Sequence, residues 1–238
     1  MLIKNCNIIY LDKIELGSVL VENGKIKEIN PKNYNGNEII DANGLYLSPG
    51  FIDVHIHGAG GHDTMDGTFE AINEISKSIV KHGTTSFTPT TMTVSVDAIR
   101  KSMEVIKEAK IKGTDGANVL GAHLEGPFIN PGAIGAQNPN FLIPPTLENY
   151  NAMVGDCEDA VVSITIAPEV PGAKELIKVL SSKGVVCSIG HTKATYEEAL
   201  EGIKCGCGHS THLFNAMTPF THREPGVVGA IFDTDITT

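Results

Sequence analysis

Two histidines one residue apart follow an apolar run in the stretch SPGFIDVHIHGAGG, residues 48–61. Residues i and i+2 of a β-strand point to the same face, so the imidazoles of His55 and His57 would enter one small volume. Neutral imidazole is a ligand that zinc and iron accept, so the pair could bind a metal ion. Two buried histidines that each hydrogen-bond to a neighbour would give the same short motif, and further ligands must decide between these interpretations.

Further side chains able to bind a metal occur later in the sequence, each after an apolar stretch. Glu125 precedes Gly-Pro in HLEGP, His191 lies in SIGHT, and His212 lies in STHLF. A glutamate at the surface end of a strand would explain Glu125 alone. Separate structural roles are a weaker explanation for four histidines and a glutamate that all follow predicted strands. We therefore predict that these five residues form one metal site. Its ligands would be Glu125, His191, His212, His55 and His57.

The elements that must position these residues alternate regularly from residue 49 onward. Helical periodicity, with Ser95 as one N-cap, separates stretches that are typical of strands. The predicted strands lie at 51–58, 84–91, 118–126, 160–169, 185–192 and 209–217. The predicted helices lie at 68–83, 95–110, 146–155, 172–184 and 195–206.

This alternation predicts an α/β fold with parallel strands, either a doubly wound sheet or a (β/α)8 barrel. Polar residues gather at the carboxyl ends of the strands, where Thr90, Thr91 and Glu169 join the candidate ligands, and a barrel builds its active site at that end. No glycine-rich G-x-G-x-x-G loop supports an open nucleotide-binding sheet. We therefore expect a TIM-type (β/α)8 barrel over residues 49–238, incomplete with about six of its eight strands.

Residues 1–48 differ from the rest of the chain and read as short strands separated by turns. Asn23 and Gly24 stand between two apolar runs, which is a strong signal of a β-hairpin. We expect these residues to form the N-terminal part of a small β-sandwich domain.

Composition excludes several classes of partner. The formal net charge is -10, with 18 basic and 28 acidic residues, which argues against nucleic acid and anionic membranes as partners. No apolar stretch reaches the roughly 18 residues of a membrane span, and the N-terminus lacks the pattern of a signal peptide. Five cysteines without disulfide spacing suit a reducing compartment, so we expect a cytoplasmic protein acting on a small molecule.

Five longer motifs carry a family resemblance: PGFIDVHIHG, HLEGPFINPGAIGAQNP, IAPE, SIGHT and THLFNAMTPFTHREPGVVGA. Through them the chain resembles the amidohydrolase superfamily, and within it the N-acetylglucosamine-6-phosphate deacetylase family, over nearly its whole length. The resemblance implies hydrolysis of the acetamide of N-acetylglucosamine 6-phosphate to glucosamine 6-phosphate and acetate, in amino-sugar catabolism. It also implies one or two divalent metal ions per chain, zinc or iron, and a homodimer in the full-length family.

The resemblance also assigns roles to individual residues. Glu125, His191 and His212 would be the principal metal ligands, with His55 and His57 at a second, neighbouring metal position. The residues that would bind the sugar phosphate are Ala136, Gln137, Asn215, Ala216 and Arg223. The family's general acid/base is an aspartate at the end of the eighth strand, expected beyond residue 238, so no catalytic residue is assigned. We expect the chain alone to be a poor catalyst.

Two alternatives stay open at this point. Another amidohydrolase, a cyclic amidase or a deaminase, would share the histidine pair, but such enzymes commonly use a modified lysine where this chain has Glu125. A noncatalytic barrel fragment is the second alternative. Metal analysis separates them, because one or two equivalents of zinc or iron support an enzyme and none favours a fragment.

Overall fold

The computed structural model describes residues 1–238, which form two compact units, Met1–Gly50 and Phe51–Thr238. Neither contains a helix with the length and apolar character needed to cross a membrane.

The smaller unit is one β-sheet, in the order β3-β2-β1-β4 with β5 also paired to β1. Its strands are β1 (Leu2–Ile9), β2 (Ile14–Glu22), β3 (Lys25–Ile29), β4 (Ile39–Asp41) and β5 (Tyr46–Leu47). The predicted hairpin is present: Glu22 pairs with Lys25, and Asn23 and Gly24 take the positive φ angles, 51° and 71°, that a tight two-residue turn needs. These residues supply a single sheet, so the sandwich stays a prediction.

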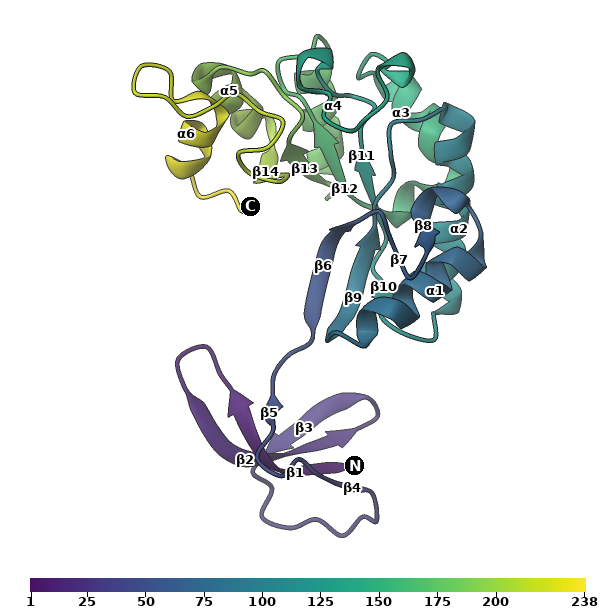
Figure 1. Cartoon of the computed structure of the whole chain (residues 1–238), viewed down its shortest axis with the longest axis vertical. Helices are drawn as coiled ribbons and strands as arrows, with labels where there is room; N and C mark the ends of the chain where they lie inside the picture. Colours follow the sequence, from purple (N-terminus) through teal and green to yellow (C-terminus); the bar gives the residue numbers. More distant parts are fainter. The chain divides into compact units, whose positions relative to one another are not determined.

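The larger unit has a mixed α/β fold in which helices connect parallel strands (Figure 1). Its sheets run in the orders β10-β9-β6 and β11-β12-β13-β14, and a parallel bridge from Thr90 to His123 joins them. The parallel strands are β6 (Phe51–Ile56), β9 (Thr84–Pro89), β10 (Asn118–Val119), β11 (Ala122–Glu125), β12 (Val161–Ile166), β13 (Val186–Ile189) and β14 (Cys207–Ser210). A two-stranded antiparallel ribbon follows β6 and consists of β7 (Gly58–Ala59) and β8 (His62–Asp63).

Each of the five predicted helices is present, and four of them begin at a capping side chain. The helices are α1 (Phe69–Val80), α2 (Val96–Lys112), α3 (Leu147–Val154), α4 (Ala173–Ser182), α5 (Tyr196–Cys205) and α6 (Gly226–Phe232). Ser95 caps α2 as expected, and Thr68, Thr146 and Thr195 cap α1, α3 and α5 by accepting hydrogen bonds from backbone N–H groups of the first turn. Their buried faces pack on the strands around Phe87, Leu124 and Ile164.

Two features differ from the sequence-based expectation. The strand predicted over 118–126 is divided into β10, which pairs with β9, and β11, which pairs with β12. The break falls at Gly121, where φ is 141° and a Cβ atom would collide with the carbonyl oxygen of Ala160. Helix α6 was not predicted, because its sequence GVVGAIF is buried on nearly all sides and shows no polar face.

Candidate metal centre

The five predicted ligands lie together at the carboxyl ends of their strands. Glu125 ends β11 and is only 2% exposed. Its Oε2 lies 3.0 Å from Nε2 of His57, and its Oε1 lies 3.3 Å from Nε2 of each of His55, His191 and His212. One buried carboxylate is therefore surrounded by four imidazoles, although up to 157 positions separate them along the chain (His212 minus His55).

These ligand atoms form two overlapping groups that could each hold a metal ion. In each group the atoms lie within 4.8 Å of one another. One group, the His55 set, comprises His55, His57 and Glu125, and the other, the His191 set, comprises Glu125, His191 and His212. Glu125 belongs to both, so its two oxygens can serve both groups.

Backbone carbonyl oxygens orient three of the imidazoles. Nδ1 of His57 lies 3.1 Å from the carbonyl oxygen of Thr90, and Nδ1 of His191 lies 3.0 Å from that of Ala133. Nδ1 of His212 lies 3.1 Å from the carbonyl oxygen of Asn215. A carbonyl only accepts, so each Nδ1 carries the hydrogen, and in the neutral ring Nε2 presents a lone pair.

The arrangement of these lone pairs fits a divalent cation. The Nε2 atoms of His191 and His212 face each other at 3.0 Å, those of His55 and His57 at 3.3 Å, and all four face the Glu125 carboxylate. Lone pairs repel at these distances unless a proton or a metal ion lies between them. Nitrogen and carboxylate oxygen donors held by carbonyl oxygens behind the rings are typical of zinc and iron sites.

Electrostatics in the metal-free cluster favour an ionised glutamate. Burial alone would raise the pKa of Glu125, but hydrogen bonds from His191, His212, His55 and His57 outweigh burial and hold this pKa well below its usual range. The hydrogen bond to Glu125 raises the pKa of His212. Burial opposes the same effect at His57, where the Glu125 contacts prevail and the pKa is also raised. Protons therefore compete more strongly with a metal ion for the Nε2 lone pairs of these two imidazoles.

Gln137 contacts the candidate metal centre directly. It is 5% exposed, its Nε2 donates to Glu125 Oε2 at 2.6 Å, and its Oε1 accepts from the backbone N–H of Thr93 at 2.7 Å. One end of the amide thus binds the glutamate and the other binds the backbone of Thr93, and the role in substrate binding that the resemblance implies for Gln137 stays a prediction. Sequence alone gave no signal for this contact, because Gln137 lies in a loop twelve positions from Glu125.

The other predicted substrate residues lie outside the helices and strands. Ala136, Asn215 and Arg223 are exposed, and Ala216 is half-buried. The backbone of the turn at 215–216 supports the ligands: Asn215 accepts from His212, and Ala216 accepts from the backbone N–H of Thr192 at 3.0 Å. The side chains of Asn215 and Arg223 are thus accessible to a ligand.

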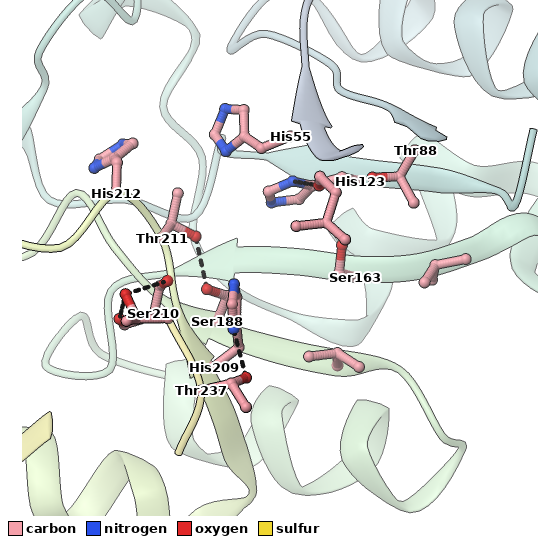
Figure 2. Close-up of a pocket in the computed structure, with 14 residues that line it drawn as sticks. His55, Thr88, His123, Ser163, Ser188, His209, Ser210, Thr211, His212 and Thr237 are labelled. Carbon is pink, nitrogen blue, oxygen red and sulfur yellow. Dashed lines mark hydrogen bonds between the residues drawn. The ribbon is translucent and has the colours of Figure 1, made fainter. Parts of the chain in front are cut away.

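A pocket of about 650 Å³ adjoins the cluster, and Figure 2 shows His55 of β6, His123 of β11 and His212 of the segment after β14 around it. A chain of hydrogen bonds links residues beside this pocket through the buried Thr165: His123 Nε2 to Thr165 Oγ1 at 2.7 Å, Thr165 to Thr211 at 2.8 Å, and Thr211 to Ser188 at 2.6 Å. Burial lowers the pKa of His123 to about 3, so this imidazole is neutral near pH 7. The chain of hydroxyls fixes the register of β11, β12 and β13 beneath the ligands.

Comparison with known proteins gives consistent matches. The sequence profile of the Amidohydrolase family matches residues 46–236. The N-acetylglucosamine-6-phosphate deacetylase of Lysinibacillus sphaericus is 36% identical over 99% of this chain and 61% of its own length. That of Bacillus subtilis (strain 168) is 37% identical over 96% of this chain and 60% of its own length. The chain thus spans about three fifths of the length of these curated relatives.

Solved structures agree with the sequence matches. The crystal structure of N-acetylglucosamine-6-phosphate deacetylase from Pasteurella multocida superposes with a TM-score of 0.91 at 30% identity, over 99% of this chain and 63% of that one. The Mycobacterium smegmatis enzyme of the same name gives a TM-score of 0.87 at 27% identity, over 98% of this chain and 66% of that one. The profile match over most of the sequence confirms the superfamily resemblance, and this chain belongs to the amidohydrolase family.

Proposed function

We propose that these residues are the metal-binding part of an enzyme that hydrolyses the acetamide of N-acetylglucosamine 6-phosphate, releasing acetate and glucosamine 6-phosphate. The observation that carries the proposal is the buried Glu125 carboxylate with four imidazole nitrogens 3.0–3.3 Å away. Relatives that bear this activity in their names support the choice of substrate.

The fold proposed for the larger unit is an incomplete (β/α)8 barrel of about six strands. Parallel strands joined by helices, with the candidate ligands at their carboxyl ends, support it. We further propose that the smaller unit is one layer of a β-sandwich, and that the whole protein acts as a homodimer.

A divalent metal, zinc or iron, bound by Glu125 and the four histidines, one or two ions per chain, would polarise the acetamide carbonyl and acidify a water molecule. The residues of the chain prepare the site for it. Carbonyl oxygens behind His57, His191 and His212 keep the Nε2 lone pairs pointing inward, and Gln137 fixes the plane of the Glu125 carboxylate. The single negative charge of Glu125 leaves the loaded site electropositive, which favours a carbonyl that develops negative charge.

The substrate's phosphate is a dianion near neutral pH and is best bound by a guanidinium and backbone N–H groups. Arg223, exposed in the loop before α6, is the proposed partner, with Asn215 and Ala216 beside the sugar. A proton must also reach the leaving amine. Glu125 already makes five contacts, and the family resemblance implies an aspartate for this role, so we propose that an aspartate outside residues 1–238 supplies that proton.

The test uses the full-length protein. Metal content and acetate release from N-acetylglucosamine 6-phosphate are measured, with unphosphorylated N-acetylglucosamine and a cyclic amide as comparison substrates. Preference for the phosphorylated amino sugar is expected, with loss of metal and activity in Glu125→Gln and neither lost in the surface control Glu201→Gln. Preference for the cyclic amide, or full metal content in Glu125→Gln, would overturn the proposal.

A further inference from the structure

Glu169 lies three residues beyond β12 and is not among the candidate ligands, yet its carboxylate accepts three hydrogen bonds. Oε1 accepts from the side-chain Nδ2 of Asn130 at 2.9 Å and from the backbone N–H of Lys193 at 2.6 Å. Oε2 accepts from the hydroxyl of Thr192 at 2.5 Å. These donors come from the loops after β11 and β13, so one side chain joins the ends of three neighbouring strands.

Two of these bonds hold the backbone beside His191. Thr192 and Lys193 directly follow this histidine, whose φ of 48° is in the left-handed region that residues with a Cβ atom seldom adopt. His191 is 4% exposed, so its ring has no freedom to compensate for a change of the turn. Glu169 therefore stabilises the turn that aims this imidazole at Glu125.

The third bond reaches the imidazole of His191 by another route. Asn130 uses Nδ2 for Glu169, Oδ1 for the backbone N–H of Gly132 at 2.7 Å, and its own backbone N–H for the carbonyl oxygen of His191 at 2.9 Å. Asn130 thereby caps the short 3-10 helix Pro131–Ala133. The carbonyl oxygen of Ala133 then accepts from His191 Nδ1 and sets its tautomer.

We propose that Glu169 is a positioning residue for the His191 set, acting through the backbone and the tautomer of His191 and touching no metal itself. The inference rests on the metal site of the proposed function. It is specific, because the contacts of Glu169 lead to His191 and none of them leads to His55 or His57. Loss of the carboxylate should weaken metal binding in the His191 set and leave the His55 set unchanged.

Glu169→Gln keeps the size of the side chain and removes one accepting oxygen. Its amide would face either the Thr192 hydroxyl, which already accepts from the backbone N–H of Ala194 at 3.0 Å, or the two N–H donors at the other oxygen. Thr192→Val removes the same contact from the other side with little change of shape, together with the hydrogen bond that the hydroxyl accepts from Ala194. Glu201→Gln, a surface glutamate paired with Lys174, is the matched control.

Zinc affinity is measured by competition with a chromophoric chelator in two backgrounds. One carries His55→Ala and His57→Ala and retains the His191 set, and the other carries His191→Ala and His212→Ala and retains the His55 set. Glu169→Gln and Thr192→Val are expected to lower zinc affinity by about 10- to 100-fold in the first background only. The visible absorption of bound Co²⁺ should change in the first background, because the direction of one imidazole changes.

Circular dichroism checks that each variant is folded. If Glu169→Gln does not fold, the zinc affinity of Thr192→Val tests the proposal instead. Unchanged zinc affinity and an unchanged Co²⁺ spectrum in the first background would overturn the proposal, as would an equal loss in both backgrounds, which would indicate general damage to the fold. If the unaltered chain binds no zinc at all, the proposed function fails, and this inference fails with it.

Discussion

Replacing Gln137 with leucine tests whether this residue holds Glu125 or serves the substrate alone. The change leaves the backbone N–H of Thr93 buried without its acceptor and removes one donor from the Glu125 carboxylate. An unsatisfied buried N–H costs about 1–3 kcal/mol, and a hydrogen bond to a charged group contributes about 1.5–3 kcal/mol. Leucine recovers part of this by burying apolar surface, so we expect the free energy of unfolding of the metal-free chain to fall by about 3 kcal/mol.

The same change should weaken metal binding, since contacts behind a ligand typically contribute about 10- to 100-fold in affinity. Urea unfolding followed at 222 nm reports the larger unit, because every α-helix lies between Phe69 and Phe232. Chelator competition gives the zinc affinity. Asn140→Ala, an exposed position in the same loop, is the control and should change neither quantity. Normal stability and zinc affinity in Gln137→Leu, with only a raised KM for the substrate, would refute the reasoning.

Three further predictions follow from the same structure. Zinc affinity should fall as pH is lowered, beginning above pH 6.5, because the raised pKa values of His57 and His212 let protons compete with the metal early; chelator competition between pH 5.5 and 8.5 measures this, and an affinity independent of pH would contradict it. The pKa of His123 is about 3 in the folded chain and about 6.5 in the unfolded chain, so between these pH values only the unfolded chain binds a proton there. This residue should therefore make the metal-free chain about 3 kcal/mol less stable at pH 4.5 than at pH 7. Urea unfolding at both pH values, compared with His123→Gln, gives that difference, and an equal pH dependence in the variant would show that the assignment is wrong. Leu124→Ala, at a fully buried position of β11, should cost about 2–5 kcal/mol of unfolding free energy, and a loss below 1 kcal/mol in the same assay would mean that β11 is not part of the core.

The elements that carry the candidate site could be predicted from the sequence because their signals are local. Strand periodicity places His55 and His57 on one face, and the carboxyl ends of parallel strands bring Glu125 near the histidines that follow other strands. The split at Gly121 was not predictable in the same way. The space that only a glycine fits there is set by the carbonyl oxygen of Ala160 on a neighbouring segment, 39 positions away along the chain (160 minus 121).

The contacts that orient the imidazole ligands could not be predicted from the sequence, for a different reason. Thr90, Ala133 and Asn215 act on the imidazoles through backbone carbonyl oxygens, which every residue type provides, so no pattern of residue types marks them. Glu169 was visible as a polar residue at a strand end, but its three partners lie 23 to 39 positions away. Only the assembled loops show what it does.

The left-handed backbone at His191 and His212, with φ angles of 48° and 37°, limits how these positions can evolve. Valine, isoleucine or threonine would strain the turn there, whereas glycine, asparagine and aspartate accept it most readily. A lineage released from the need for a metal should therefore drift toward Gly, Asn or Asp at these two sites, and toward a wider range of residues at His55 and His57, where φ is negative. In descendants that no longer bind a metal, the histidine positions of the His191 set and those of the His55 set would therefore show different substitutions.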